Sequence, residues 1–123
     1  MAAVTGANLG VKHGWDAVTH ESGWGDDMNA NLRRMDALIQ LRVTNQTTAT
    51  PPGSPADGDR YIIGASATGV WATHEKKVAV YHSAGVVTPA WAIYTPKIGW
   101  VAYVSAETKF YYYDGTNWVN PLP

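Results

Sequence analysis

The segment at residues 110–119 reads FYYYDGTNWV, and it decides the interpretation of the fold. Four consecutive aromatic residues, an Asp-Gly pair and a tryptophan are typical of two strands joined by a tight turn, since Asp-Gly favours the positive φ angles of hairpin turns. Alternation along the first strand places Tyr111 and Tyr113 on one face and Phe110 and Tyr112 on the other. Both faces are therefore aromatic. One packs on the domain, and the other needs a cover, which is another strand, another subunit or a ligand.

Upstream of this hairpin, further short runs predict more strands. They are rich in Val, Ile, Tyr and Trp and are separated by turn-forming residues. The runs are RYIIG (60–64), KVAVYH (77–82), AWAIYT (90–95) and WVAYVS (100–105). We therefore predict a mainly β fold, in which residues 59–123 form a small antiparallel β domain of short strands and hairpins.

The stretch before the strands is a predicted linker. Residues 44–58 contain three prolines and two glycines among small polar residues. Proline has no backbone N–H and cannot continue a helix, so this composition favours extended chain. We expect the boundary between two modules to lie here.

Residues 25–43, GDDMNANLRRMDALIQLRV, predict one amphipathic helix. Its acidic start suits the positive end of a helix dipole, and its apolar residues recur with helical spacing. Two heptads are too few to hold a coiled coil alone. The apolar stripe packs either on the β domain of the same chain or between subunits. The second alternative makes four residues candidates for an oligomer interface: Met28, Leu32, Met35 and Ile39.

The first 24 residues are rich in Gly, Ala, Asn and Thr and show no clear period. Trp15 and Trp24 lie beside glycines, whereas disordered segments are poor in tryptophan. We therefore expect residues 1–24 to be an extended N-terminal arm that anchors the chain through these two rings. The segment has neither the basic start nor the apolar run of a signal peptide, so we expect a soluble protein that is made in the cytosol.

Composition excludes several classes of function. The formal net charge is −1 and the isoelectric point is about 6.4, so bulk electrostatics attract neither nucleic acid nor anionic membranes. Cysteine is absent, which removes disulfides and thiolate metal sites. No apolar run reaches the roughly 18 residues that span a bilayer. We expect no nucleic-acid partner and no membrane insertion.

Residues that carry chemistry do not fall into known patterns. The four histidines lack the spacing of metal ligands, and no serine sits in a Gly-x-Ser-x-Gly elbow. We therefore predict that the chain is not an enzyme, with no catalytic residue, metal or cofactor. The aromatic residues remain. Each ring is core, subunit interface or a platform for stacking on sugars, and the candidates for glycan binding are Trp71, Trp91, Trp100 and Trp118.

Several blocks of the sequence match a known pattern in order. That pattern is a helix ending in an LDALVQL-like run, then PP-x-SP-x-x-GDRYIVG-x-x-ATG-x-WA-x-H, then TP-x-x-GW and a terminal YDG-x-x-W. The corresponding positions here are 35–41, 51–63, 67–74, 95–100 and 113–118. In these blocks the chain resembles an uncharacterised virion domain family that occurs in tailed phages, prophages and phage-derived gene transfer agents.

The resemblance covers about residues 30–119 and implies a structural protein of a bacteriophage particle. This would be a spike, tail fibre or adaptor component of head or tail, made in the host cytoplasm. Such proteins are commonly homotrimers, so the implied partners are further copies of the chain and other head, portal or tail proteins. The arm would attach to them. The alternative is a carbohydrate-binding module for host-surface glycans, because tryptophans of relatives are regarded as sugar-binding candidates.

Overall fold

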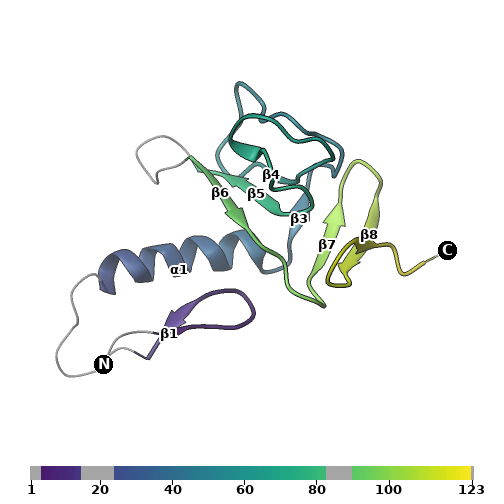
Figure 1. Cartoon of the computed structure of the whole chain (residues 1–123). Helices are drawn as coiled ribbons and strands as arrows, with labels where there is room; N and C mark the ends of the chain where they lie inside the picture. Colours follow the sequence, from purple (N-terminus) through teal and green to yellow (C-terminus); the bar gives the residue numbers. More distant parts are fainter. Residues whose placement is uncertain (1–3, 15–23, 83–89, 123) are drawn as a thin grey trace. The chain divides into compact units, whose positions relative to one another are not determined.

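The computed structural model describes residues 4–14, 24–82 and 90–122 (Figure 1). The chain divides into two compact units, Met1–Ile39 and Gln40–Pro123, and each is described by itself. In chain order the elements are β1 (Val4–Thr5), β2 (Lys12–His13), α1 (Trp24–Leu38), β3 (Arg42–Val43), β4 (Arg60–Ile62), a 3₁₀ turn (Gly69–Trp71), β5 (Val78–Tyr81), β6 (Trp91–Tyr94), β7 (Val101–Val104), β8 (Lys109–Tyr113) and β9 (Trp118–Val119). The mainly β fold class is confirmed.

In the first unit, the described part of the arm is a hairpin and not an extended chain. β1 pairs antiparallel with β2, and Val4 lies opposite His13. The Gly6 N–H donates to the Val11 carbonyl at 2.8 Å. A Cβ on Gly6 would lie 2.9 Å from that carbonyl oxygen, so the turn requires glycine. Sequence reasoning missed this hairpin because two-residue strands leave no visible period.

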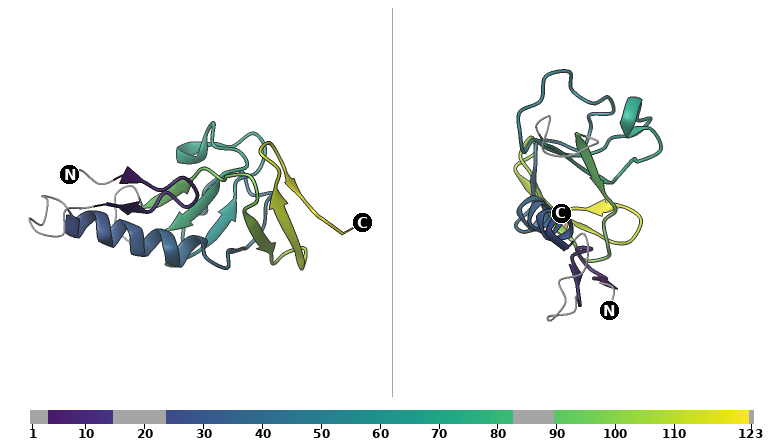
Figure 2. Two further views of the ribbon diagram at one scale, coloured as in Figure 1. Left: turned by 90° about the horizontal axis from the view of Figure 1, so that it is seen from below. Right: turned by 90° about the vertical axis from the view of Figure 1, so that its left-hand side faces the viewer.

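The hairpin is held on the helix by the side chain of Asn31, which is only 4% exposed. The Asn31 Oδ1 accepts from the Lys12 N–H at 2.8 Å, and its Nδ2 donates to the Lys12 carbonyl at 2.9 Å. The side-chain amide has one acceptor and one donor group, as a peptide bond has. It therefore satisfies the N–H and the carbonyl of Lys12 in the way that a neighbouring strand would. Figure 2 shows β1 and β2 running alongside α1.

The helix ends earlier than its apolar period predicts. α1 stops at Leu38 and not at residue 43, because Gln40 adopts the left-handed conformation with φ of 53°. The residues that follow pair with β7: the carbonyls of Leu41 and Val43 accept from the backbone N–H groups of Tyr103 and Ser105, each at 2.9 Å. The prediction that the helix continues through residues 39–43 is therefore wrong. Although the helical spacing of apolar residues continues there, Arg42 and Val43 pair with β7.

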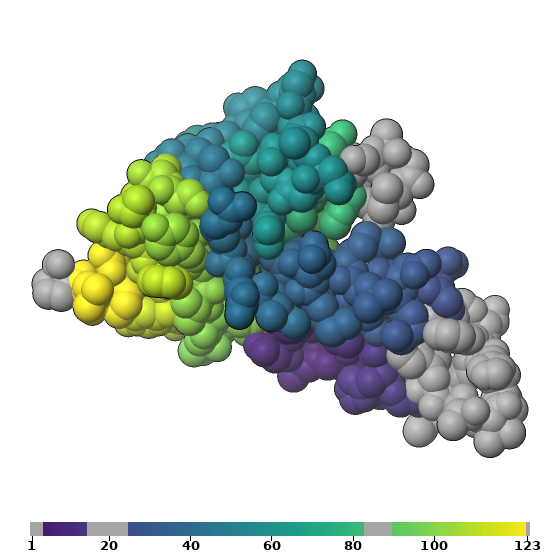
Figure 3. Space-filling model, turned by 180° about the vertical axis from the view of Figure 1, so that it is seen from behind, coloured from purple at the N-terminus to yellow at the C-terminus, as the bar shows by residue number. Residues whose placement is uncertain are grey.

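The described part of the second unit forms two sheets, with strand orders β3-β7-β8-β9 and β4-β5-β6. β3 and β7 are parallel, and the other pairs are antiparallel. The segment 44–48 joins the sheets. The Thr44 carbonyl accepts from the Ala106 N–H just after β7, while the Thr44 N–H donates to the Arg60 carbonyl in β4 and the Thr48 carbonyl accepts from the Gly64 N–H. In Figure 3 this blue segment lies between the yellow-green β7–β8 hairpin and the teal β4. The predicted linker, residues 44–58, therefore belongs to the β unit. The boundary between the two units lies earlier, between Ile39 and Gln40.

The sheet β4-β5-β6 gathers its rings in a buried cluster. Trp71 is completely buried and meets Trp91 edge to face, with ring centroids 5.0 Å apart. Tyr61 and Tyr81 pack against these two indoles, and Ile63 and Ala79 complete the cluster. Such edge-to-face pairs add to the free energy gained by burying the ring area.

The β7–β8 hairpin points aromatic residues away from the core. Tyr112 lies opposite Val101, and Phe110 lies opposite Tyr103, so all four side chains share one face. We call these four residues the outer face. Phe110 is 59% exposed, Val101 54% and Tyr112 37%. On the opposite face of the same hairpin, Ala102 and Val104 are completely buried.

The Asp-Gly pair at residues 114–115 does lie in a hairpin loop, as predicted. Tyr113 pairs with Trp118, so the loop spans residues 114–117. Gly115 alone in this loop has a positive φ, of 105°, so the loop is not the two-residue turn that Asp-Gly favours. The Asp114 Oδ1 instead accepts from the N–H groups of Thr116 and Asn117 at 2.8 and 2.7 Å. These bonds hold the pKa of Asp114 below its usual value.

Candidate functional site

The four tryptophans that were candidates for glycan binding are buried. The exposed fractions are zero for Trp71, 7% for Trp91, 8% for Trp100 and 9% for Trp118. A sugar ring stacks on an uncovered indole face, and none of the four offers one of any size. The sequence pattern could not separate a core ring from a platform, because both are large, apolar and flanked by strand residues.

The candidates for the oligomer interface and for the anchor belong to the first unit. Of the predicted interface residues, Met28 and Met35 are partly buried, whereas Leu32 and Ile39 are each 54% exposed. Trp15 lies outside the described residues. Trp24 begins α1, but its side chain also lies outside the described part. The anchor and interface assignments stay predictions.

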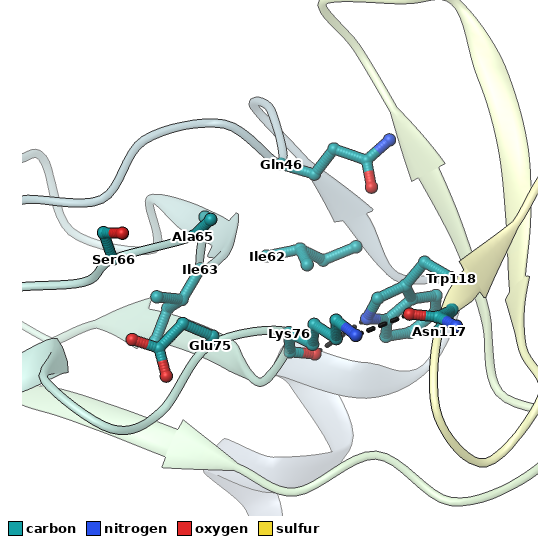
Figure 4. A pocket seen from close by; sticks show the side chains of 10 residues that line it. Gln46, Ile62, Ile63, Ala65, Ser66, Glu75, Lys76, Asn117 and Trp118 are labelled. Atoms are coloured by element: carbon teal, nitrogen blue, oxygen red, sulfur yellow. Dashed lines mark hydrogen bonds between the residues drawn. The ribbon is translucent and has the colours of Figure 1, made fainter.

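The β unit contains a pocket that the sequence did not indicate (Figure 4). Its volume is about 330 Å³. Four separate segments line it: residue 46, residues 62–66, residues 75–76 and residues 117–118. Only tertiary structure brings these segments together, so no spacing in the sequence signals them.

One side of the pocket is fixed by bonds between the two sheets. The Trp118 Nε1–H donates to the Lys76 carbonyl at 2.7 Å. The Lys76 ammonium in turn donates to the Asn117 Oδ1, and Figure 4 shows both bonds. Lys76 adopts the left-handed conformation, with a φ of 70°. The Asn117 backbone is held by Asp114: its N–H donates to the Asp114 Oδ1 at 2.7 Å, and its carbonyl accepts from the Asp114 N–H at 3.0 Å.

The top of the pocket in Figure 4 is formed by Gln46. Its Nε2 donates to the Glu107 Oε2 at 2.7 Å, and the Tyr111 hydroxyl donates to the other carboxylate oxygen. These bonds, the one from Gln46 first, lower the pKa of Glu107, while the bond to Glu107 raises the pKa of Tyr111. Because the amide nitrogen is held by Glu107, the Gln46 oxygen is turned toward Ile62.

The side of the pocket opposite Asn117 carries a fixed negative charge. Glu75 lies there in Figure 4, and its Oε2 accepts from the Ala67 N–H at 2.9 Å. The pKa of Glu75 is lowered mainly by its own backbone N–H and then by that of Ala67. The carboxylate is therefore ionised at neutral pH.

Neither a metal site nor a membrane-spanning helix occurs among the described residues. Within residues 4–14, 24–82 and 90–122, no three His, Asp or Glu side chains are grouped so that they could hold a metal ion. In the same ranges, no helix has both the length and the hydropathy that crossing a membrane requires.

Comparisons with known proteins place the chain in a family. No curated protein matches it. The family described as "Protein of unknown function (DUF2793)" matches residues 28–119. This range includes most of α1, both sheets and every residue that lines the pocket. The chain therefore belongs to the DUF2793 family of proteins of unknown function.

Proposed function

We propose that the chain is a structural protein of a phage particle, a spike, fibre or adaptor of head or tail, which assembles as a homo-oligomer, with a trimer favoured. The observation that carries the assembly part is the apolar surface that the single chain leaves uncovered. The virion part rests on the resemblance of the sequence blocks between the helix and the terminal YDG-x-x-W motif.

The uncovered surface occurs on both units. In the β unit, Val101, Phe110 and Tyr112 lie together on the outer face. In the first unit, Leu32 on α1 and Ile39, the residue directly after its end, are exposed. A contiguous apolar patch of several hundred Å² on a soluble protein commonly marks an interaction site. Copies of the chain that cover these residues would remove them from water, at roughly 25 cal/mol for each Å² of apolar area.

The oligomer is tested by sedimentation equilibrium of the purified chain. A homotrimer has a mass of about three times 13.3 kDa, independent of protein concentration over the range studied. A single species at the mass of one chain, with the β unit folded as judged by near-ultraviolet circular dichroism, contradicts the assembly.

The particle location needs its own experiment. An antibody against the chain, applied to phage particles purified by density gradient and viewed by negative-stain electron microscopy, should label one site on head or tail. Disrupted particles should also contain the chain in a fixed ratio to the major head protein. Absence of the chain from purified particles contradicts the virion role and leaves the oligomer result standing.

Attachment through the arm is part of this proposal. Trp15 and Trp24 are the anchor candidates, and a double Trp15→Ala, Trp24→Ala variant should keep the oligomer mass but be lost from particles. A His13→Ala variant serves as the control, since His13 lies exposed in β2. The glycan module of the alternative hypothesis has less support as stacking on the four tryptophans, since all four are buried.

A further inference from the structure

We propose that the open edge of β6 pairs with the same edge of a second copy of the chain, antiparallel and about a two-fold axis at Ala92. Two three-stranded β4-β5-β6 sheets then become one continuous sheet. This contact is separate from the outer face, which lies on the other sheet, and it does not depend on the proposed virion role.

The edge of β6 is open because β5 bonds to one side of it only (Figure 1). The His82 N–H donates to the Ala90 carbonyl at 2.8 Å, and residues along an antiparallel pair alternate between bonded and non-bonded positions. Ala92 therefore bonds to β5, whereas the backbone N–H and carbonyl groups of Trp91 and Ile93 point away from it. In the described part of the chain, these outward groups have no hydrogen-bond partner.

Within the described residues, the edges at β4 and β9 are protected and the edge at β6 is not. The segment 44–48 covers β4, where the Ile62 N–H donates to the Asn45 carbonyl at 3.1 Å. β9 is two residues long and is followed closely by Pro121, which has no N–H. Soluble proteins usually protect an edge strand with a charge, a proline or a cover. Residues 90–95, AWAIYT, contain neither a charge nor a proline.

A second copy fits this edge because the donors and acceptors of β6 complement themselves. With the two-fold axis at Ala92, Trp91 of one copy lies opposite Ile93 of the other. Each of these two pairs exchanges two backbone bonds, so the outward groups of both residues are satisfied. A two-fold contact uses the same patch on both copies, and an uncharged strand does not repel its own copy.

The side chains support the same register. Trp91 and Ile93 belong to the buried aromatic cluster, in which Ile93 is only partly buried. Cross-strand pairs of an aromatic and a β-branched residue are favourable, so Trp91 of the second copy covers the exposed part of Ile93. At the axis, the two Ala92 residues form a non-bonded pair, in which Cα atoms approach to about 4.5 Å. Alanine is small enough for this position.

The contact is small. Two strands of four residues bury far less than the roughly 1,200 Å² at which stable interfaces begin. The pairing is therefore transient between free molecules, and the mass at low concentration is that of the outer-face oligomer. The pairing becomes strong where copies are held close together, because tethering raises their effective concentration.

A disulfide can trap the pair, since the chain has no cysteine of its own. A separation of about 4.5 Å between the two Ala92 Cα atoms lies within the range of disulfides. Under mild oxidation, Ala92→Cys should form a covalent dimer, seen on non-reducing gels, at least about tenfold faster than Val70→Cys. Val70 is 60% exposed in the same unit, so its thiol measures random collision. Ile93→Cys is the register control and should behave like Val70→Cys, because Ile93 lies opposite Trp91 of the other copy.

A proline tests the backbone bonds themselves. Ile93→Pro, added to Ala92→Cys, removes an N–H that points away from β5 and leaves the bonds to β5 in place. The variant, verified as folded by near-ultraviolet circular dichroism, should dimerise at a rate close to that of Val70→Cys. If the proline unfolds the domain, the comparison of Ala92→Cys with Val70→Cys and Ile93→Cys decides alone.

Three results overturn the proposal: equal rates for Ala92→Cys and Val70→Cys, a rate for Ile93→Cys as fast as that for Ala92→Cys, or a folded Ile93→Pro variant that keeps the fast rate. The same assay with Phe110→Ser and Tyr112→Ser separates the two contacts. Ala92→Cys should still dimerise without those rings, and a dimer that disappears with them also overturns the edge pairing. A covalent dimer from a chain that sediments as a single copy at low concentration supports the pairing and removes the assembly role alone.

Discussion

The two sheets of the β unit use the same kinds of residues in opposite ways. In β4-β5-β6, Tyr61, Trp71, Tyr81 and Trp91 meet in one buried cluster. In the other sheet, the β7–β8 hairpin turns Phe110 and the other residues of the outer face toward solvent. The first set of rings contributes to the stability of the fold. The second set is free to contribute to association.

The difference comes from what lies over each sheet, and not from the strands themselves. β5 is the central strand, and Val78, Ala79 and Val80 are all buried, so chain covers both of its faces. The β7–β8 hairpin has chain over one face only, as the buried Ala102 and Val104 show. An alternating aromatic strand is therefore a reliable sign of a sheet and a poor sign of which face is core.

The largest effect should come from the buried cluster. Trp71→Ala removes a completely buried indole and should lower the free energy of unfolding by about 3–5 kcal/mol, because the loss of apolar burial adds to the cost of a cavity. This is a large part of the stability of a small domain. Urea unfolding followed by tryptophan fluorescence measures it.

The neighbouring residue provides the control for that variant. Val70 is 60% exposed, so Val70→Ala should change the free energy of unfolding by less than about 0.5 kcal/mol. Equal effects at the two positions would contradict the cluster as the stabilising core of the β4-β5-β6 sheet.

A smaller effect should come from the place where the two sheets are joined. A Cβ on Gly64 would lie 2.6 Å from the backbone oxygen of Thr47, so Gly64→Ala must push the 44–48 segment away. Overpacking of this kind costs about 1–3 kcal/mol. Gly53→Ala meets no atom within 4 Å and should leave the urea midpoint unchanged within about 0.5 kcal/mol. If both variants behave alike, the close approach of the two strands is not what joins the sheets.

The bond that ties Gln46 to the β7–β8 turn should show in the pH dependence of stability. The pKa of Glu107 is lowered from 4.5 in the folded chain by Gln46 and Tyr111. The ionised form therefore stabilises the fold above about pH 4.5, and this contribution is lost as pH falls through the lower, folded pKa. Glu107→Gln should cost less than about 1 kcal/mol at pH 7, since the group is partly screened by water.

The role of Glu107 is tested by the difference in stability between wild type and Glu107→Gln as a function of pH. Urea midpoints of wild type and Glu107→Gln, recorded from pH 7 to pH 2, should converge below pH 4.5. Glu75 and Asp114, whose pKa values are also lowered, contribute equally to both curves and cancel. A difference that is constant over the whole range contradicts the stabilising role of the ionised carboxylate.

The smallest effect on stability should come from the outer face. Phe110→Ser combined with Tyr112→Ser should change the unfolding free energy of the monomer by less than about 0.5 kcal/mol for each residue, while the sedimentation mass should fall toward 13.3 kDa. Val70→Ser, at an exposed site elsewhere, should keep the oligomer. An oligomer that survives loss of both rings would show that the outer face is not its interface.

Much of the β unit could be predicted from sequence because its strands are long enough to show a pattern. Runs such as KVAVYH and KFYYYD mark β5 and β8, and Asp114–Gly115 marks the hairpin that follows. The end of α1 could not be predicted, because Ile39 and Leu41 continue the helical spacing while the chain turns at Gln40. The helical period assigns Asn31 to the polar side, and only the hairpin on the helix explains its burial.

The pocket was beyond sequence reasoning for a different reason. Its polar groups, Gln46, Lys76 and Asn117, come from segments up to 71 positions apart, since Asn117 lies that far from Gln46. Each is an ordinary loop residue in its own segment. The Trp118 indole bond to Lys76 and the bond between Lys76 and Asn117 connect segments that only the tertiary structure brings together.

The segment that begins at β3 has a consequence for synthesis on the ribosome. During synthesis β4, which bonds to the residues just after β3, leaves the ribosome soon after them. β7, which pairs with β3 itself, begins only at Val101. A nascent chain that stops before β7 therefore holds one edge of β3 unpaired, and open strand edges recruit other chains. Premature termination before Val101 should thus produce insoluble fragments.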